Sequence, residues 1–234
     1  MNINSDFSKN ILIDTHASSW QVSPMKGVER KPLDRIGDEI ARATSLVKYA
    51  PNSHFSGHIH TGGEEFLVLE GVFQDEHGDY PAGTYIRNPP QSSHIPFSDE
   101  GCVILVKLWQ FELADRFQMN VNIYDKFDKT SGQTELCCLY ENNHEKVAVL
   151  RIKAGESYSF SKHDGLELFV LEGEGTITPT NELTSMQIRQ AFWFRQGVDA
   201  SIVIEANTEM TIWLKHDHLL NVPQQIKNLR SHTT

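Results

Sequence analysis

Three histidines and two glutamates stand at spacings that suit a metal site. His58 and His60 are separated by one residue, Glu64 and Glu65 follow directly after a pair of glycines, and His94 comes later in the chain behind two consecutive prolines. Neutral imidazoles together with one carboxylate suit a borderline divalent ion such as zinc, iron(II), manganese, nickel or copper. We therefore predict that this part of the chain binds one divalent metal ion.

The elements that carry these side chains read as short strands. In a strand, side chains two positions apart lie on the same face, so His58 and His60 can converge on one point inside a barrel. The Gly62-Gly63 pair allows a tight turn, which can bring a glutamate of the next strand back towards that point. His94 can complete the set from a more distant strand.

The rest of the chain supports an all-β fold. Short segments rich in Val, Ile, Leu, Tyr and Phe alternate with turns rich in Gly, Pro, Asn, Asp and Ser, and no long window has a helical period. Short strands at near-regular spacing are typical of a sandwich or barrel.

An internal repeat indicates two domains. Residues 46–52 followed by 65–71 resemble residues 149–156 followed by 167–173 in order, spacing and turn chemistry. We expect two tandem copies of one unit: residues 1–118 as a metal-binding domain and residues 119–234 as a second copy. That copy has Phe160 and Lys162 where the first has His58 and His60, so we expect no metal there.

The metal residues also resemble the cupin superfamily. The first cupin motif, His-x-His-x(3,4)-Glu-x(6)-Gly, is met by His58, His60, Glu64 and Gly71. The second, Gly-x(5)-Pro-x-Gly-x(2)-His, is met by Gly83, Pro89 and His94, with Gln91 where glycine is usual. The resemblance implies two tandem cupin barrels, that is, double-stranded β-helices or jelly rolls.

Either glutamate satisfies the spacing of the first motif. The second copy has Glu167 at the position of Glu65 but Leu166 at that of Glu64. A glutamate retained where the other ligands are missing has a structural role, so Glu64 is the predicted ligand.

More narrowly, residues 15–110 resemble the cupin domain of the ChrR anti-sigma factors. This resemblance implies a metal-binding bicupin of the ChrR-like type, with zinc as the expected ion and a regulatory, sensory or ligand-binding role linked to the oxidative stress response. The sigma-binding part of that family is a helical zinc domain with a His-x(3)-Cys-x(2)-Cys motif. Nothing before residue 45 supplies that motif, so direct binding of a sigma factor is not expected.

A second hypothesis is an enzyme. Four ligands can fill a tetrahedral zinc site, but around Fe(II), Mn or Ni they leave positions for substrate and dioxygen. The alternative is thus a non-haem metal-dependent dioxygenase acting on a small enolic or diketone-like substrate. Tyr85 and Arg87 share one strand face and are candidates for lining its pocket. No catalytic residue is assigned, and whether the chain is an enzyme stays open.

Composition limits the partners. The chain has 21 Lys and Arg against 31 Asp and Glu, a formal net charge of −10, which disfavours nucleic acid and anionic membranes. No apolar run is long enough to span a membrane. Cys102, Cys137 and Cys138 form no metal or redox motif and indicate reduced thiols in a cytoplasmic protein. A small-molecule ligand or effector is the expected partner. Since cupins often pair through sheet edges, a homodimer is an alternative to pairing within the chain.

Overall fold

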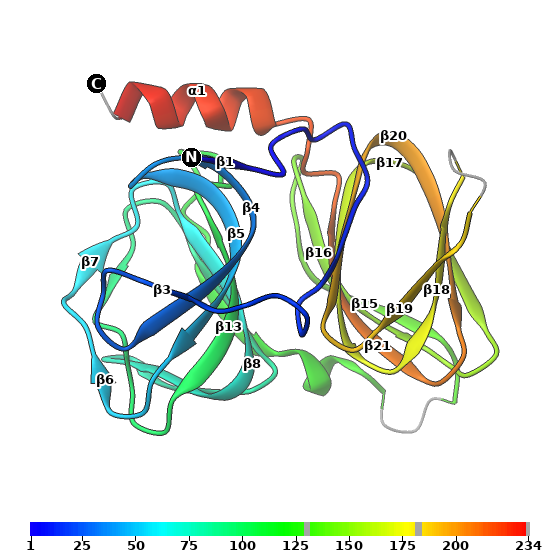
Figure 1. Ribbon diagram of the computed structural model, residues 1–234, viewed down its shortest axis with the longest axis horizontal. Helices are drawn as coiled ribbons and strands as arrows, with labels where there is room; N and C mark the ends of the chain where they lie inside the picture. The colour runs from blue at the N-terminus through cyan, green and yellow to red at the C-terminus, as the bar shows by residue number, and fades with distance from the viewer. Residues whose placement is uncertain (129–131, 181–183, 233–234) are drawn as a thin grey trace. The chain divides into compact units, whose positions relative to one another are not determined.

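The chain folds into two β-units. The computed structural model describes residues 1–128, 132–180 and 184–232. Unit 1 comprises Met1–Ser5, Ser19–Tyr124 and the chain from Pro223 onward, and unit 2 comprises Asp6–Ser18 and Asp125–Val222. In each unit antiparallel strands roll up into a barrel (Figure 1). The predicted all-β fold with two barrels is confirmed.

The strands of unit 1 are mostly short, as the frequent turn residues require. Their bounds are β1 (Asn2–Ile3), β3 (Gln21–Val22), β4 (Val28–Gly37), β5 (Ala41–Tyr49), β6 (Ser53–His54), β7 (His58–Ile59), β8 (Glu64–Asp75), β9 (Gly78–Pro81), β10 (Thr84–Asn88), β11 (Ser93–His94), β12 (Phe97–Ser98), β13 (Cys102–Leu108) and β14 (Met119–Asn122). The main sheet has the order β1-β4-β5-β13-β8-β10-β14, and β7 and β11 form a separate two-stranded sheet.

Unit 2 has fewer and longer strands. They are β2 (Ile11–Asp14), β15 (Glu135–Glu141), β16 (Lys146–Ile152), β17 (Ser157–Glu172), β18 (Glu174–Pro179), β19 (Met186–Arg189), β20 (Phe192–Ala206) and β21 (Met210–His216). Their order is β15-β16-β21-β17-β20-β18-β19, with β2 paired to β20. A short 3-10 helix, Ile123–Lys126, precedes this unit in the chain, and helix α1 spans Val222–His232.

Two terminal segments belong to the unit that is remote from them in sequence. Strand β2 hydrogen-bonds to β20, so the segment around it belongs to unit 2. In α1, the Gln225 side chain accepts a hydrogen bond from Arg42 (2.8 Å), so the helix belongs to unit 1. Residues 119–122 form β14 and pair with β10, which places them in unit 1. A single boundary at residues 118 and 119 does not describe these exchanges.

Strand alternation decides which side chains enter the barrel of unit 1. Phe66 and Val68 of β8, Ile86 of β10 and Ile104 and Val106 of β13 pack together in a buried core cluster. The residues between them face the other side of the same strands. This division positions the site, because Glu64 shares the inner face with Phe66 whereas Glu65 does not.

On the face of the sheet that points away from the barrel interior, each unit has a glutamate, an arginine and a lysine that are all buried. In unit 1, Glu65 stands in register with Arg87 on one neighbouring strand and Lys107 on the other. In unit 2, Glu167 stands in register with Arg195 and Lys215 in the same way. All six side chains are buried. The structure thus extends the sequence repeat to residues that the two copies share on this face.

Within residues 1–128, 132–180 and 184–232, no helix is both long and apolar enough to cross a membrane.

Candidate metal centre

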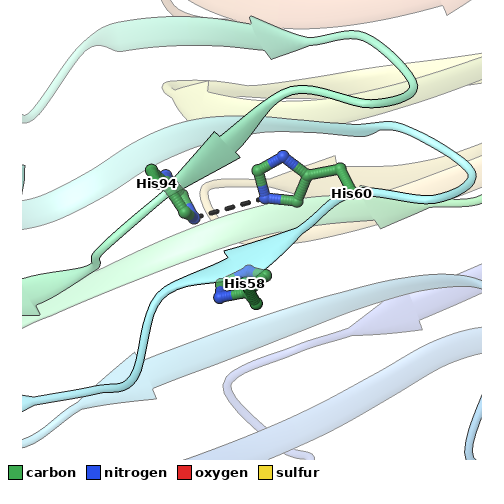
Figure 2. A group of neighbouring side chains, drawn as sticks. All are labelled: His58, His60 and His94. Atoms are coloured by element: carbon green, nitrogen blue, oxygen red, sulfur yellow. Dashed lines mark hydrogen bonds between the residues drawn. The ribbon is translucent and has the colours of Figure 1, made fainter.

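His58, His60 and His94 meet at one point in unit 1. Strand β7 pairs with β11 so that His58 lies directly opposite His94, and the amide of His60 donates to the carbonyl of Ser92 (2.9 Å). One nitrogen atom of each ring lies within 4.8 Å of those of the other two (Figure 2). The predicted convergence of the three histidines is therefore found in the structure.

Glu64 completes the cluster with its carboxylate. Its Oε1 atom lies 3.4 Å from His60 Nε2 and 3.7 Å from His94 Nε2. Burial raises the pKa of Glu64, but the hydrogen bond and charge of His60, with the charges of His94 and His58, outweigh it and hold the pKa below its usual value. The group therefore remains a carboxylate, the form that binds metal.

The Gly62-Gly63 pair is required by two aromatic rings. A Cβ atom on Gly62 would fall against the indole ring of Trp109, and one on Gly63 would lie 2.5 Å from the ring of Phe111. Gly63 also has a φ of +79°. The Trp109 amide donates to the Gly63 carbonyl (3.1 Å), which ties this turn to the end of β13. The glycines thus permit a close approach that fixes where Glu64 begins its strand.

The outer nitrogen of each histidine faces an oxygen atom. His60 Nδ1 lies 3.0 Å from Ser92 Oγ, His94 Nδ1 lies 3.4 Å from a carboxylate oxygen of Asp75, and His58 Nδ1 lies 3.5 Å from the Ser56 carbonyl. The last two oxygens can only accept. Ser92 Oγ donates its own hydrogen to the Pro89 carbonyl (2.7 Å), so it too accepts from the imidazole. In the neutral form of His60, the Ser92 contact therefore places the hydrogen on Nδ1 and leaves a lone pair on Nε2.

This tautomer pattern is the one that metal-binding histidines adopt. His60 Nε2 and His94 Nε2 lie 3.3 Å apart, a distance that suits either a hydrogen bond between the two rings or two ligands of one ion. Tetrahedral ligands at the usual zinc–nitrogen bond length stand about 3.3–3.4 Å apart. The 3.3, 3.4 and 3.7 Å separations among His60, His94 and Glu64 match that requirement. The residues present fit a divalent metal ion.

The site opens into a cavity of about 650 Å³. Its buried walls are largely apolar and include Val28, Val47, Ile104 and Val106. Met25, Lys26, Glu39 and Ile59 also line it and are exposed to solvent, so they lie where the cavity opens. Because the three histidines and Glu64 line this same space, a small molecule can reach them.

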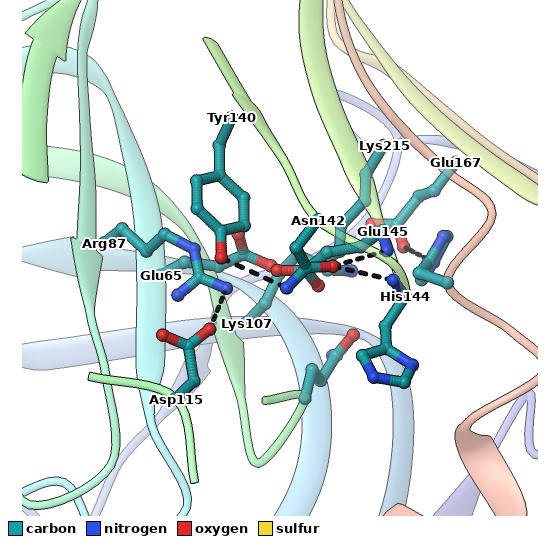
Figure 3. Close-up of polar contacts among 12 residues, drawn as sticks. Glu65, Arg87, Lys107, Asp115, Tyr140, Asn142, His144, Glu145, Glu167 and Lys215 are labelled. Atoms are coloured by element: carbon teal, nitrogen blue, oxygen red, sulfur yellow. Dashed lines mark hydrogen bonds and ion pairs between the residues drawn. The ribbon is translucent and has the colours of Figure 1, made fainter. Parts of the chain in front are cut away.

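Tyr85 and Arg87 do not line the cavity, against the expectation from the sequence. Ile86 takes the inward position on β10, so its two neighbours face outward. The Tyr85 hydroxyl donates to a carboxylate oxygen of Glu65 (2.6 Å), and the Arg87 guanidinium pairs with Asp115 (2.8 Å; Figure 3). Every residue of β10 is buried, so alternation of polar and apolar residues could not reveal which face is which.

Glu64 and Glu65 lie on opposite faces of β8. Glu65 accepts from Tyr85 on the outer face, whereas Glu64 reaches the histidine cluster. Glu167 of unit 2 accepts in the same manner from Trp193 (2.8 Å). The comparison of the two copies had assigned Glu65 to a structural role, and its contacts agree with that interpretation.

Where unit 1 has His58, His60 and Glu64, unit 2 has Phe160, Lys162 and Leu166. Phe160 and Leu166 are buried in its core cluster, and Lys162 is exposed and pairs with Asp199 (2.9 Å). Within the described residues, the grouping suited to a metal ion is His58, His60 and His94 of unit 1.

Sequence reasoning missed four residues around the site. Ser92 and Asp75 orient histidines across distances that no local spacing reveals. Arg30 and Tyr49 also line the cavity. For Arg30 the sequence held a signal of its inward orientation, because Arg30 lies two residues from the apolar Val28 and so belongs to the same strand face.

The comparisons with known proteins agree with this fold. Residues 8–112 match the model of a family described as the ChrR Cupin-like domain. No curated protein matches the sequence. The solved structure of YlbA from E. coli is similar, with a TM-score of 0.67 and 14% identity over 90% of this chain and 92% of that one.

Two solved enzymes share the fold as well. A variant of oxalate decarboxylase from Bacillus subtilis, with one tryptophan replaced by tyrosine, aligns with a TM-score of 0.62 and 10% identity over 88% of this chain and 76% of that one. A glycine-to-alanine variant of salicylate 1,2-dioxygenase from Pseudoaminobacter salicylatoxidans aligns with a TM-score of 0.57 and 10% identity, covering 78% and 72%. These likenesses show that the chain shares the cupin fold, and the family match adds that residues 8–112 are similar to the ChrR Cupin-like domain.

Proposed function

We propose that unit 1 binds one divalent metal ion through His58, His60, Glu64 and His94, and that a small molecule reaches the ion through the cavity. The observation that carries this proposal is the orientation of the histidines. One ring nitrogen of each histidine lies within 4.8 Å of the other two, and Nε2 of His60 and of His94 lie 3.4 and 3.7 Å from the same carboxylate oxygen of Glu64. A divalent cation bound at this point would be held by imidazole nitrogens and a carboxylate oxygen together.

The cavity supports a site that is open to ligands. Structural zinc sites are closed by protein ligands, whereas catalytic and ligand-binding sites keep a position accessible. Here the four side chains line a space of about 650 Å³ that connects to exposed residues. When bound, a divalent ion would polarise an oxygen atom of a ligand as a Lewis acid. The apolar walls would exclude water, and the histidines and Glu64 would hold the ion in place.

Two uses of this site follow from different observations. The family match of residues 8–112 favours a ChrR-like sensory or regulatory protein, linked to the oxidative stress response, in which a small ligand or oxidant acts at the metal. The open cavity favours a metal-dependent dioxygenase acting on a small enolic or diketone-like substrate. Zinc suits the first use, and Fe(II), Mn or Ni suits the second.

Metal analysis tests the shared part of the proposal. Protein purified without added metal should contain one equivalent of a divalent ion per chain by inductively coupled plasma mass spectrometry. His60→Ala should lower that content to near zero, whereas His144→Ala, at an exposed position of unit 2, should leave it unchanged. If half of the metal remained in His60→Ala, unit 2 would have to bind some of it, against this assignment.

Oxygen uptake separates the two uses. The metal-loaded protein should be assayed with an oxygen electrode in the presence of β-diketones and flavonols. Bound iron with substrate-dependent oxygen consumption would exclude a purely regulatory metal. Stoichiometric zinc without turnover would exclude the dioxygenase.

A further inference from the structure

The metal cavity contains a guanidinium group on the inner face of the barrel. Arg30 of β4 stands opposite Val47 of β5, and Val28 stands opposite Tyr49 two residues away. Cross-strand partners in an antiparallel sheet project to the same side, as do residues two apart. Val28 and Val47 are buried in the core cluster, so Arg30 and Tyr49 face inward with them. Both line the cavity that holds the histidines.

Within the part of the chain that the structure describes, the charge of Arg30 has no counter-ion. Glu29, the adjacent residue, faces the other way and pairs with Lys48 (3.2 Å). Glu64 is held by His60 and His94. Across the described residues, Arg30 takes part in no ion pair. A half-buried guanidinium beside apolar walls is costly without an anion, because its five N–H donors lose part of their hydration.

Tyr49 lines the same cavity as Arg30 and Glu64. Its ring packs edge-on against Phe55 (5.1 Å between centroids) and Phe73 (5.8 Å). Burial raises the pKa of its hydroxyl well above the usual value, the charge of Glu64 raises it further, and Arg30 acts in the opposite direction. Tyr49 is therefore within electrostatic reach of both groups, and its hydroxyl stays protonated as a donor.

We propose that the cavity takes a small organic anion, with a carboxylate held by the Arg30 guanidinium and the Tyr49 hydroxyl and with its other end directed to the metal cluster. This inference rests on the proposed function, because the same cavity gives access to the metal. A planar guanidinium binds a carboxylate in a bidentate manner, and Arg30, which has no ion pair among the described residues, is available to do so. Lys26, exposed on the cavity lining, adds a second positive charge at the opening.

The local charge matters because the chain as a whole repels anions. Its formal net charge is −10, so an anionic ligand gains no general electrostatic attraction. Arg30 and Lys26 provide that attraction at this opening, where Glu39 is the one exposed acidic residue among the described lining residues. A neutral molecule of the same shape would leave Arg30 without its partner and would bind more weakly.

Calorimetry with matched ligands tests the inference. Malonate and malonamide have similar shapes and differ in charge, and each should be titrated into metal-loaded and metal-free protein. Malonate should bind the metal-loaded protein at least about tenfold more tightly than malonamide. Arg30→Gln should weaken malonate binding about tenfold to a hundredfold, the usual effect of losing a hydrogen bond to a charged group. Arg30→Lys should lose most of the malonate affinity that Arg30 provides, because lysine keeps the charge but not the planar pair of N–H donors.

Lys48→Gln is the matched control, since it removes one positive charge from the adjacent strand on the outward, exposed side. It should bind malonate like the wild type, and thermal unfolding of all variants should confirm that they fold. Equal binding of malonate by wild type and Arg30→Gln, with metal bound in both, would overturn the inference. A wild-type protein that takes up no metal would overturn the proposed function instead, and Arg30-dependent malonate binding by that metal-free protein would still support the anion site.

Discussion

His60 Nδ1 lies 3.0 Å from Ser92 Oγ, and the hydroxyl hydrogen of Ser92 is already committed to the Pro89 carbonyl at 2.7 Å. The serine can therefore only accept from the imidazole, which fixes the hydrogen of His60 on Nδ1. One hydroxyl thus prepares Nε2 of His60 for a metal ion. The corner that contains the two prolines sets this geometry, because it holds both the carbonyl and the serine.

Ser92→Ala should weaken metal binding without abolishing it. Loss of the acceptor leaves the Nδ1 hydrogen of His60 without a partner and frees the ring to rotate or change tautomer. Removing such a partner typically costs about tenfold to a hundredfold in metal affinity. Competition with a chromophoric chelator measures the change. Ser93→Ala alters an exposed neighbour and should bind metal like the wild type. Equal affinities for both variants would show that Ser92 does not orient His60.

Gly62→Ala should destabilise unit 1, because the new methyl group meets the Trp109 ring. Overpacking of this kind costs about 1–3 kcal/mol of unfolding free energy. Urea titration followed by circular dichroism measures it. Gly132→Ala, where no atom lies within 4 Å of the added Cβ, is the control and should change stability little. In a Trp109→Ala background the cost of Gly62→Ala should largely vanish; an unchanged cost would mean that the ring is not the obstacle.

Acid should destabilise unit 2 through His163. Burial lowers the pKa of His163 below its ordinary 6.5, and its Nε2 lies 3.0 Å from Gln196 Oε1. Within the described residues its Nδ1 has no hydrogen-bond partner, so a second hydrogen there would be buried without an acceptor. The unfolded chain therefore binds a proton near pH 6.5 that the folded chain does not. Stability is present above that pH and is lost as the pH falls towards the lower, folded-state value.

The measurement is the unfolding free energy between about pH 7 and pH 5. Wild type should lose stability over this range more steeply than His163→Gln, by at most about 1.4 kcal/mol per pH unit. His144→Gln changes an exposed histidine and should keep the wild-type slope. Since burial also lowers the pKa of His216, some slope should persist in His163→Gln. Identical slopes in wild type and His163→Gln would contradict the assignment.

Cys138 should be the thiol that reacts first. Burial raises the pKa of Cys102 to about 11, and burial with the neighbouring Glu135 raises the pKa of Cys137 to about 11, so both remain thiols at neutral pH. Cys138 is exposed. Titration of the native protein with Ellman's reagent at about pH 8 should show one fast equivalent, and Cys138→Ser should remove it. Rapid reaction of two or three thiols would show that the other two are accessible.

The convergence of the histidines and Glu64 could be predicted because the information for it is local or repeated. His58 and His60 are two residues apart in the sequence, although β7 ends at Ile59 between them, and the second copy of the chain distinguished Glu64 from Glu65. His94 required a family motif, and the β7–β11 pairing that places it opposite His58 is visible in the structure. The domain exchange by β2 and α1 had no sequence signal, because it depends on pairing between distant segments.

The pocket residues show where such reasoning fails. Tyr85 and Arg87 were expected at the site because they share parity on a strand near it, but parity alone does not say which face is inward. Strand β10 is buried on both faces, so its sequence pattern does not indicate which face points into the barrel. On β4, by contrast, Lys31 and Glu29 alternate with Val28 and Arg30, and the position of Val28 in the core settles the face. The sequence therefore places an arginine inside the barrel only where the opposite face of the same strand is polar.

The buried charged residues on the outer faces occur in both units, whereas the histidine cluster occurs in one, so features of the fold can be distinguished from features of the metal site. Both copies have the buried glutamate, arginine and lysine, with Glu65 and Glu167 as the two glutamates, whereas among the described residues the metal-type cluster stands in one copy. Unit 2, which lacks this cluster among its described residues, therefore serves as an internal reference for unit 1. A property that both barrels share cannot be credited to the ion, and a difference between them in ligand binding or redox response can be traced to the residues around His60.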